Sequence, residues 1–148
     1  MAARPPVPAP PYDGGCLCGA VRYRLSARPL AVNACHCTDC KLIAPRDAFT
    51  HGGEVARYRK RAVSGREIDI CRCAVCGTRL WHEPLSSPGL VFIAAGTLDD
   101  ASWVVPASHI WIERASPGVV FQDDALIVEG QPATREMLMD AFTRLYGP

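Results

Sequence analysis

The fold of this chain depends on the stretch Ala34-Cys35-His36-Cys37-Thr38-Asp39-Cys40-Lys41, in which three cysteines fall within six residues. Thiols this close in sequence are poorly placed for disulfides to one another, whereas they suit a single thiophilic metal ion. Four protein ligands would make that ion a closed structural site, and three would leave one coordination position for chemistry. We therefore interpret the stretch as a metal site whose ligand count decides its function.

The composition predicts one globular domain. The chain has 148 residues, 49% of them apolar and 21% charged, with a formal net charge of +1. A net charge this small does not indicate a nucleic-acid-binding protein. No stretch reaches the roughly 20 apolar residues that a membrane span requires. Residues Met1–Pro11 include five prolines and no apolar signal-peptide core, which predicts a disordered lead and a cytoplasmic protein. We assign residues 12–148 to a single zinc-binding domain.

Hydrophobic periodicity predicts a mainly β protein. Alternating apolar residues indicate strands at 20–25, 55–63, 66–72 and 108–113, and an apolar run predicts a central strand at 90–95. Residues 30–34 read as a further strand, whereas 41–53 read as irregular. The single expected helix lies at the C-terminus, with Thr134 as its N-cap and its apolar positions at Met137, Ala141, Phe142 and Leu145.

The eight cysteines form three groups, and no export signal accompanies them, which favours metal over disulfides. In two groups a glycine follows the last cysteine, as Gly19 after Cys18 and Gly77 after Cys76. A glycine there can adopt positive φ and turn backbone amides toward the sulfurs, as in a zinc knuckle. Joined, these two half-sites predict a closed zinc site. Its ligands are Cys16, Cys18, Cys73 and Cys76.

Cys35, Cys37 and Cys40 are then left for a second ion, but spacing alone allows alternatives. Cys71-Arg72-Cys73-Ala74-Val75-Cys76 repeats the same Cys-x-Cys-x-x-Cys pattern. Cys71 is either a fourth ligand of the second ion or a buried thiol of a strand. His51, His82 and His109 are each a candidate fourth ligand or acid–base group, and His36 points away from the metal in our interpretation.

Three motifs carry a resemblance to a known family: Gly15-Cys16-Leu17-Cys18-Gly19, Cys35-His36-Cys37-Thr38-Asp39-Cys40, and Cys73-Ala74-Val75-Cys76-Gly77. In this order they resemble the glutathione-dependent formaldehyde-activating enzymes (GFA), strongest over residues 13–114. The resemblance implies an Mss4-like β-tent fold with a structural zinc at Cys16, Cys18, Cys73 and Cys76. It also implies an exchangeable zinc at Cys35, Cys37 and Cys40, which would be the catalytic residues.

The function expected from these observations is that of a zinc-dependent carbon–sulfur lyase. The resemblance implies that a small thiol such as glutathione is joined to formaldehyde or a related aldehyde, or released from the adduct. The alternative is a non-enzymatic, zinc-stapled interaction module. We expect neither a nucleic-acid nor a membrane partner, and the sequence leaves the oligomeric state open.

Overall fold

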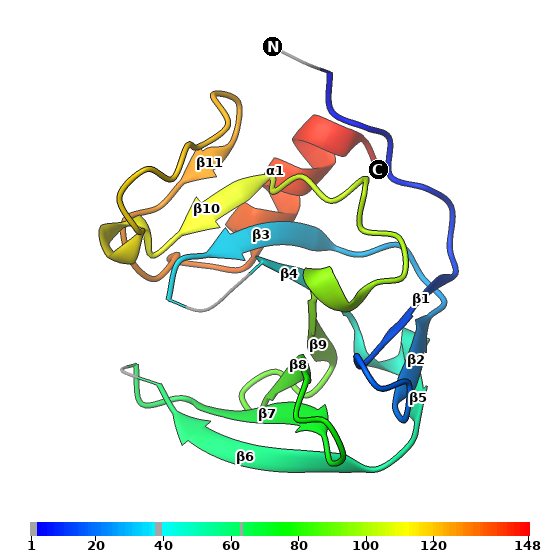
Figure 1. The fold of residues 1–148 in the computed structure, drawn as a ribbon. Helices are drawn as coiled ribbons and strands as arrows, with labels where there is room; N and C mark the ends of the chain where they lie inside the picture. The colour runs from blue at the N-terminus through cyan, green and yellow to red at the C-terminus, as the bar shows by residue number, and fades with distance from the viewer. Residues whose placement is uncertain (1–2, 38–39, 63) are drawn as a thin grey trace.

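The computed structural model describes residues 3–37, 40–62 and 64–148, which form two β-sheets and one α-helix (Figure 1). The mainly β fold with a late helix, predicted from the sequence, is confirmed. The elements are β1 (Tyr12–Gly15), β2 (Arg22–Leu25), β3 (Ala31–Cys35), β4 (Cys40–Pro45), β5 (Phe49–Gly52), β6 (Val55–Arg61), β7 (Glu67–Cys73), β8 (Arg79–Pro84), β9 (Leu90–Ala94), β10 (Ser108–Ile110), β11 (Leu126–Ile127) and α1 (Glu136–Tyr146), with short 3-10 turns at Arg46–Ala48, Ala95–Thr97 and Ile112–Arg114.

The larger sheet has eight strands in the order β11-β10-β3-β4-β9-β8-β7-β6, and the smaller sheet has the order β1-β2-β5. β10 runs parallel to both β3 and β11, whereas the other neighbouring strands are antiparallel. Figure 1 shows the larger sheet folding back on itself, so that β3 and β10 face β6 and β7 across the molecule. β9 occupies a central position, as its apolar sequence predicts.

An aromatic cluster joins the small sheet to the large one. Tyr23 in β2, Phe49 in β5 and Trp81 in β8 are all nearly inaccessible to solvent. The Phe49 and Trp81 rings meet edge to face with centroids 4.9 Å apart, and Tyr23 lies 5.4 Å from Phe49. β2 alternates exposed and buried side chains as predicted, because one face covers this cluster and the other meets solvent.

The segment predicted to be irregular, 41–53, is mostly strand. β4 lies between β3 and β9, and Leu42, Ile43 and Ala44 are all buried. A strand covered on both faces has a continuous apolar run rather than an alternating pattern, so periodicity does not reveal it. Pro45 ends this strand, and β5 begins after one 3-10 turn.

The C-terminal helix differs from the prediction in its cap and in its buried face. α1 has Arg135 as its N-cap with no side-chain cap hydrogen bond, so the assignment to Thr134 was wrong. Leu138, Ala141 and Phe142 are buried, whereas Met137 is 36% exposed. The helix face that packs on β3 and β10 therefore begins at Leu138, one residue later than the predicted face, which begins at Met137.

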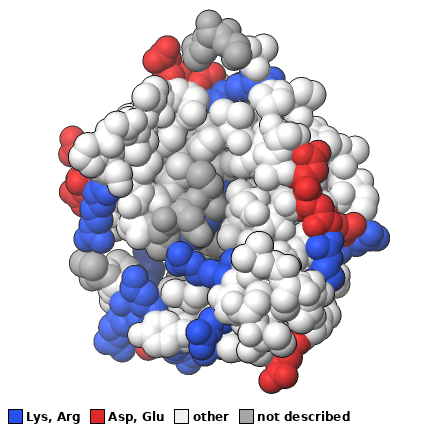
Figure 2. Space-filling model, viewed as in Figure 1, with Lys and Arg blue, Asp and Glu red and all other residues white. Residues whose placement is uncertain are grey.

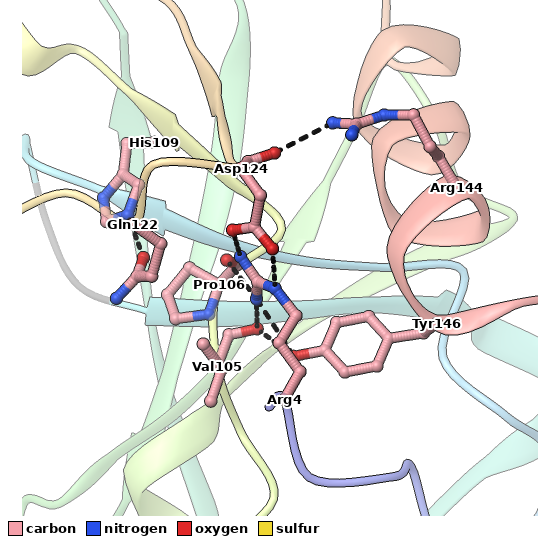
Figure 3. Close-up of polar contacts among 8 residues, drawn as sticks. All are labelled: Arg4, Val105, Pro106, His109, Gln122, Asp124, Arg144 and Tyr146. Atoms are coloured by element: carbon pink, nitrogen blue, oxygen red, sulfur yellow. Dashed lines mark hydrogen bonds and ion pairs between the residues drawn. The ribbon is translucent and has the colours of Figure 1, made fainter. Parts of the chain in front are cut away.

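Residues 3–11 run as an extended segment along the domain, which differs from the predicted disorder (Figures 1 and 3). The Arg4 guanidinium forms a bidentate pair with Asp124, at 2.6 and 2.9 Å, and donates to the Pro106 carbonyl at 2.9 Å. The Tyr146 hydroxyl, at the end of α1, accepts from Arg4 at 3.2 Å and donates to the Val105 carbonyl. These contacts connect the segment to parts of the chain more than a hundred residues away in sequence.

Candidate functional site

Four cysteine sulfurs from two distant parts of the chain form one cluster. Cys16 and Cys18 lie in the turn between β1 and β2, while Cys73 ends β7 and Cys76 follows in the next turn. All four sulfurs lie within 4.8 Å of one another. The Cys16–Cys18 distance is 3.5 Å and the Cys18–Cys73 distance is 3.8 Å. The structure thus assembles the set that the sequence predicts for a closed site.

Backbone geometry around the cluster follows the knuckle pattern. Gly19 and Gly77 have φ of 79° and 77°, a region that favours glycine. The Val21 amide donates to the Cys16 sulfur at 3.2 Å, and the Cys76 amide donates to the Cys73 sulfur at 3.4 Å. Such donors stabilise thiolates, which are the form of cysteine that binds metals.

The pKa of the Cys76 thiol also favours the thiolate form that binds metals. Hydrogen bonds from the Thr78 hydroxyl and amide lower the pKa of the Cys76 thiol to about 5. The Thr78 hydroxyl lies 3.0 Å from this sulfur and also accepts from the Leu17 amide of the other turn, at 3.2 Å. Thr78 therefore links the two half-sites and favours a thiolate at neutral pH.

These four sulfurs fit a zinc ion. Zinc–sulfur bonds of about 2.3 Å in a tetrahedron place neighbouring sulfurs about 3.8 Å apart. The measured 3.5 and 3.8 Å are close to that edge length, and four soft donors match the preference of zinc.

The predicted second site lies at the end of β3. Cys35 is its last residue, and the Cys35 and Cys37 sulfurs are 2.7 Å apart. Cys40 opens β4 opposite Ala34, so the backbone returns the third predicted ligand to the same end of this strand pair. The Cys40 side chain lies outside the described structure, as do Thr38 and Asp39. Two sulfurs sharing a zinc would stand about 1 Å farther apart than Cys35 and Cys37 do.

His36 contacts a second histidine that the sequence did not connect with it. Its Nε2 lies 3.1 Å from His109 Nδ1, and the two rings are stacked at 5.3 Å. His109 Nε2 lies 2.6 Å from Gln122 Oε1, which can only accept, so His109 carries its proton on Nε2 and accepts from His36. Burial lowers the pKa of His109. This chain of hydrogen bonds orients His36 between the two cysteines.

Cys71 lies on the opposite face of the large sheet from Cys35 and Cys37. Its neighbour Ile70, paired with His82, lines the cavity next to those cysteines, and successive residues of a strand point to opposite faces. Cys71 itself is fully buried, pairs with Trp81, and accepts a hydrogen bond from Arg57 at 3.3 Å. Burial raises the pKa of its thiol to about 12. These properties are those of a core thiol, the second of the two readings that the sequence allowed.

A cavity of about 320 Å³ opens beside Cys35 and Cys37, between the two halves of the large sheet. His82 lines it, whereas His51 packs against Trp81 at 4.7 Å on the other face. Apolar residues from both halves of the sheet and from α1 contribute to its wall: Ile43, Ile68, Ile70, Phe92, Ile110 and Leu138. Figure 2 shows Lys and Arg side chains gathered at the lower left of the molecule, where the β6–β7 hairpin lies in Figure 1.

The model of the glutathione-dependent formaldehyde-activating enzyme family matches residues 11–114 of this chain, which include all eight cysteines. The chain belongs to this family. The GFA fold is Mss4-like, as the resemblance implied, and the four-sulfur cluster is compatible with its zinc sites. Residues 115–148, with β11 and α1, lie beyond the matched region.

A curated protein of Halomonas elongata, whose name provisionally assigns it to the glutathione-dependent formaldehyde-activating enzymes, is 31% identical over 102 residues. The alignment covers 59% of this chain and 65% of that relative, so the chain spans less than two thirds of the relative's length. A crystal structure of a Rhodobacter sphaeroides protein superposes with a TM-score of 0.48 at 18% identity, over 59% of this chain and 87% of that one. Within the described residues, no helix is both long and apolar enough to cross a bilayer.

Proposed function

We propose that this GFA protein is a zinc-dependent carbon–sulfur lyase that joins a small, glutathione-like thiol to formaldehyde or a related aldehyde and catalyses the reverse reaction. In this proposal Cys16, Cys18, Cys73 and Cys76 hold a structural zinc within one domain spanning residues 12–148. Cys35, Cys37 and Cys40 hold an exchangeable ion next to the substrate.

One observation carries this proposal: Cys35 and Cys37 line the cavity, whereas the four-sulfur cluster supplies a complete set of four ligands from residues that do not line it. A closed cluster has no position for a substrate. A three-cysteine site bordering a cavity of about 320 Å³ has both an open position and space for a small molecule. The family name supplies the thiol and the aldehyde.

Zinc held by the three cysteines would supply Lewis acidity that lowers the pKa of a substrate thiol. The thiolate sulfur then adds to the carbonyl carbon of formaldehyde, forming the carbon–sulfur bond as the carbonyl π electrons move to oxygen. The oxygen takes up the proton that the thiol lost, so atoms and charges balance without an oxidant or reductant. The cavity would hold both reactants next to each other, which lowers the entropic cost of bringing them together.

The test is to load the purified protein with zinc and follow glutathione and ¹³C-formaldehyde by NMR. We expect adduct exchange faster than in buffer alone, and we expect Cys37→Ser to abolish the acceleration while the folded state persists. Equal exchange rates with and without protein would overturn the proposal. X-ray absorption at the zinc edge adds a second readout, because a thiol that binds the metal changes its coordination shell.

The alternative, a zinc-stapled interaction module, is favoured by one feature of the closed cluster. Leu17 and Val75, at the tips of its two turns, are 94% and 73% exposed. Exposed apolar side chains of this size are typical of contact surfaces when they are contiguous. A zinc coordination shell that no thiol alters would support this function instead.

A further inference from the structure

A chain of hydrogen bonds leads from Gln122 through His109 to His36, the residue between Cys35 and Cys37. The Gln122 Oε1 atom lies 2.6 Å from His109 Nε2, and His109 Nδ1 lies 3.1 Å from His36 Nε2. Because Gln122 Oε1 can only accept, the proton of neutral His109 is on Nε2, and its Nδ1 accepts from His36. Neutral His36 then carries its own proton on Nε2. One side-chain amide therefore sets the tautomers of two imidazoles.

The ring of Phe121 packs against both imidazoles. The planes of His36 and His109 differ by only 19°, and the Phe121 ring meets each of them edge to face. Its centroid lies 5.4 Å from that of His36 and 4.9 Å from that of His109. The His36 amide also donates to the Ile110 carbonyl at 3.0 Å. His36 is therefore held at its ring and at its backbone by residues that are far from it in sequence.

Phe121 and Gln122 lie beyond residues 11–114, the region that the family model matches. They belong to the connection that leads to β11, and β11 pairs with β10. Asp124, two residues after Gln122, is held by its bidentate pair with Arg4, as Figure 3 shows. The position of Gln122 is thus fixed by a neighbouring strand on one side and by the N-terminal segment on the other.

The position of Cys37 depends on His36, because β3 ends one residue before His36. Cys35 is the last residue of β3 and pairs with Ile110 of β10. Cys37 lies beyond the strand and is exposed. Fixing the ring of His36 restricts the conformations open to this turn. A metal site binds its ion more tightly when the ligands are held in place by their surroundings before the ion arrives.

We propose that Gln122 and His109 are positioning residues for the exchangeable metal site. By fixing the tautomer of His36, they hold the turn from Cys35 to Cys37 in the conformation that binds the ion. The C-terminal segment, although outside the family match, is then a functional part of the site. The inference concerns which ring nitrogen carries a proton and involves no change of charge. It rests on the proposed function only for the ion bound at this turn.

The first test is NMR of the zinc-loaded protein with ¹⁵N-labelled histidines, near pH 8, above the ordinary histidine pKa of about 6.5. Correlations between ring nitrogens and ring hydrogens distinguish the two neutral tautomers, and we expect the Nε2–H form for both His36 and His109. Gln122→Leu removes the acceptor and should give a mixture of tautomers at His109. Gln122→Glu keeps an acceptor at this place and should keep the Nε2–H form. Rescue by glutamate but not by leucine separates a hydrogen-bonding role from a packing role.

The second readout is release of the exchangeable ion in a chelator competition. We expect Gln122→Leu to weaken binding of the first zinc lost by about tenfold or more, since residues that orient metal ligands typically contribute roughly 10- to 100-fold to affinity. Gln122→Glu should bind this ion as the unchanged protein does. Gln131→Leu is the matched control, because it is the same substitution in the same segment at a residue that lines the cavity. It should change neither the tautomers nor the zinc affinity.

An Nδ1–H form of His109 in the unchanged protein would overturn the proposal, and this measurement decides even if Gln122→Leu does not fold. Altered tautomers in Gln122→Leu with unchanged zinc affinity would also overturn it, because the hydrogen bonds would then not act on the metal site. Expected tautomers and zinc affinities without any acceleration of adduct exchange would support the positioning role and overturn only the proposed reaction. Thermal melts of each variant separate a weakened site from lost folding.

Discussion

The Cys18 sulfur lies 3.8 Å from the Cys73 sulfur, although 55 residues separate them in the chain. Cys18 belongs to the turn of the small sheet and Cys73 ends β7 of the large one. A metal bound by both would close this long loop and hold the two sheets over the Tyr23, Phe49 and Trp81 rings. The cluster is therefore positioned to contribute directly to folding.

Cys73→Ser should remove the cooperative unfolding transition of the zinc-loaded protein. Structural zinc binds with free energies on the order of 10 kcal/mol, comparable to the whole stability of a typical domain. Thermal denaturation followed by circular dichroism, with zinc content by mass spectrometry, measures both effects. A variant that keeps its transition and its full zinc content would show that this cluster binds no structural metal.

Cys37→Ser should have a different outcome, since Cys37 is exposed at the end of the β3–β4 pair and belongs to the proposed exchangeable site. We expect the unchanged protein to bind about two zinc ions and this variant about one, with a nearly unaltered melting transition. A chelator competition should show the same ion leaving first from the unchanged protein. Unfolding as complete as that of Cys73→Ser would refute the division into two kinds of site.

Cys71→Ala should leave the zinc content unchanged and reduce the free energy of unfolding by about 1 kcal/mol, a typical cost for a conservative core change. Because burial raises the pKa of the Cys71 thiol to about 12, it should also be the slowest cysteine to react with iodoacetamide near neutral pH. Peptide mass spectrometry after timed labelling checks this order. Loss of zinc from Cys71→Ala would instead identify Cys71 as a ligand.

Arg4→Gln should destabilise the protein in a pH-dependent way. Hydrogen bonds from Arg4 lower the pKa of Asp124 in the folded state, so the pair stabilises the protein above the ordinary carboxyl pKa of about 4. As the pH falls through the lowered folded pKa, Asp124 is protonated and this contribution is lost. The difference in unfolding free energy between Arg4→Gln and the unchanged protein should therefore shrink between about pH 6 and pH 3.

Chemical denaturation across this range measures that difference. Arg72→Gln, at an exposed position of β7, should show no comparable change with pH. A pH-independent effect of Arg4→Gln would indicate that the carbonyl and Tyr146 contacts of Arg4 matter more than the Asp124 pair.

Local patterns determined much of this fold. The alternation in β2 and β7, the apolar run of β9 and the knuckle glycines at Gly19 and Gly77 are properties of short segments, so the sequence predicts them correctly. The missed strand β4 and the shifted face of α1 depend on what packs against them. Leu42 and Ile43 form a strand because β3 and β9 flank it, and that neighbourhood is absent from the local sequence.

The sequence by itself sorted the eight cysteines into three groups, predicted metal binding for seven of them, and supplied the motifs that indicate the family. Spacing alone could not distinguish Cys35-His36-Cys37 from Cys71-Arg72-Cys73, because the two spacings are identical. The role of Cys71 was decided only by the tertiary structure: the folded-back sheet places Cys35 and Cys37 at a cationic cavity and buries Cys71 on the opposite face. It also brought Arg135 to that cavity from beyond the family match. The sequence fixes which side chain stands at each position. Whether that side chain reaches a cavity depends on which strands, far apart in sequence, become neighbours in the sheet.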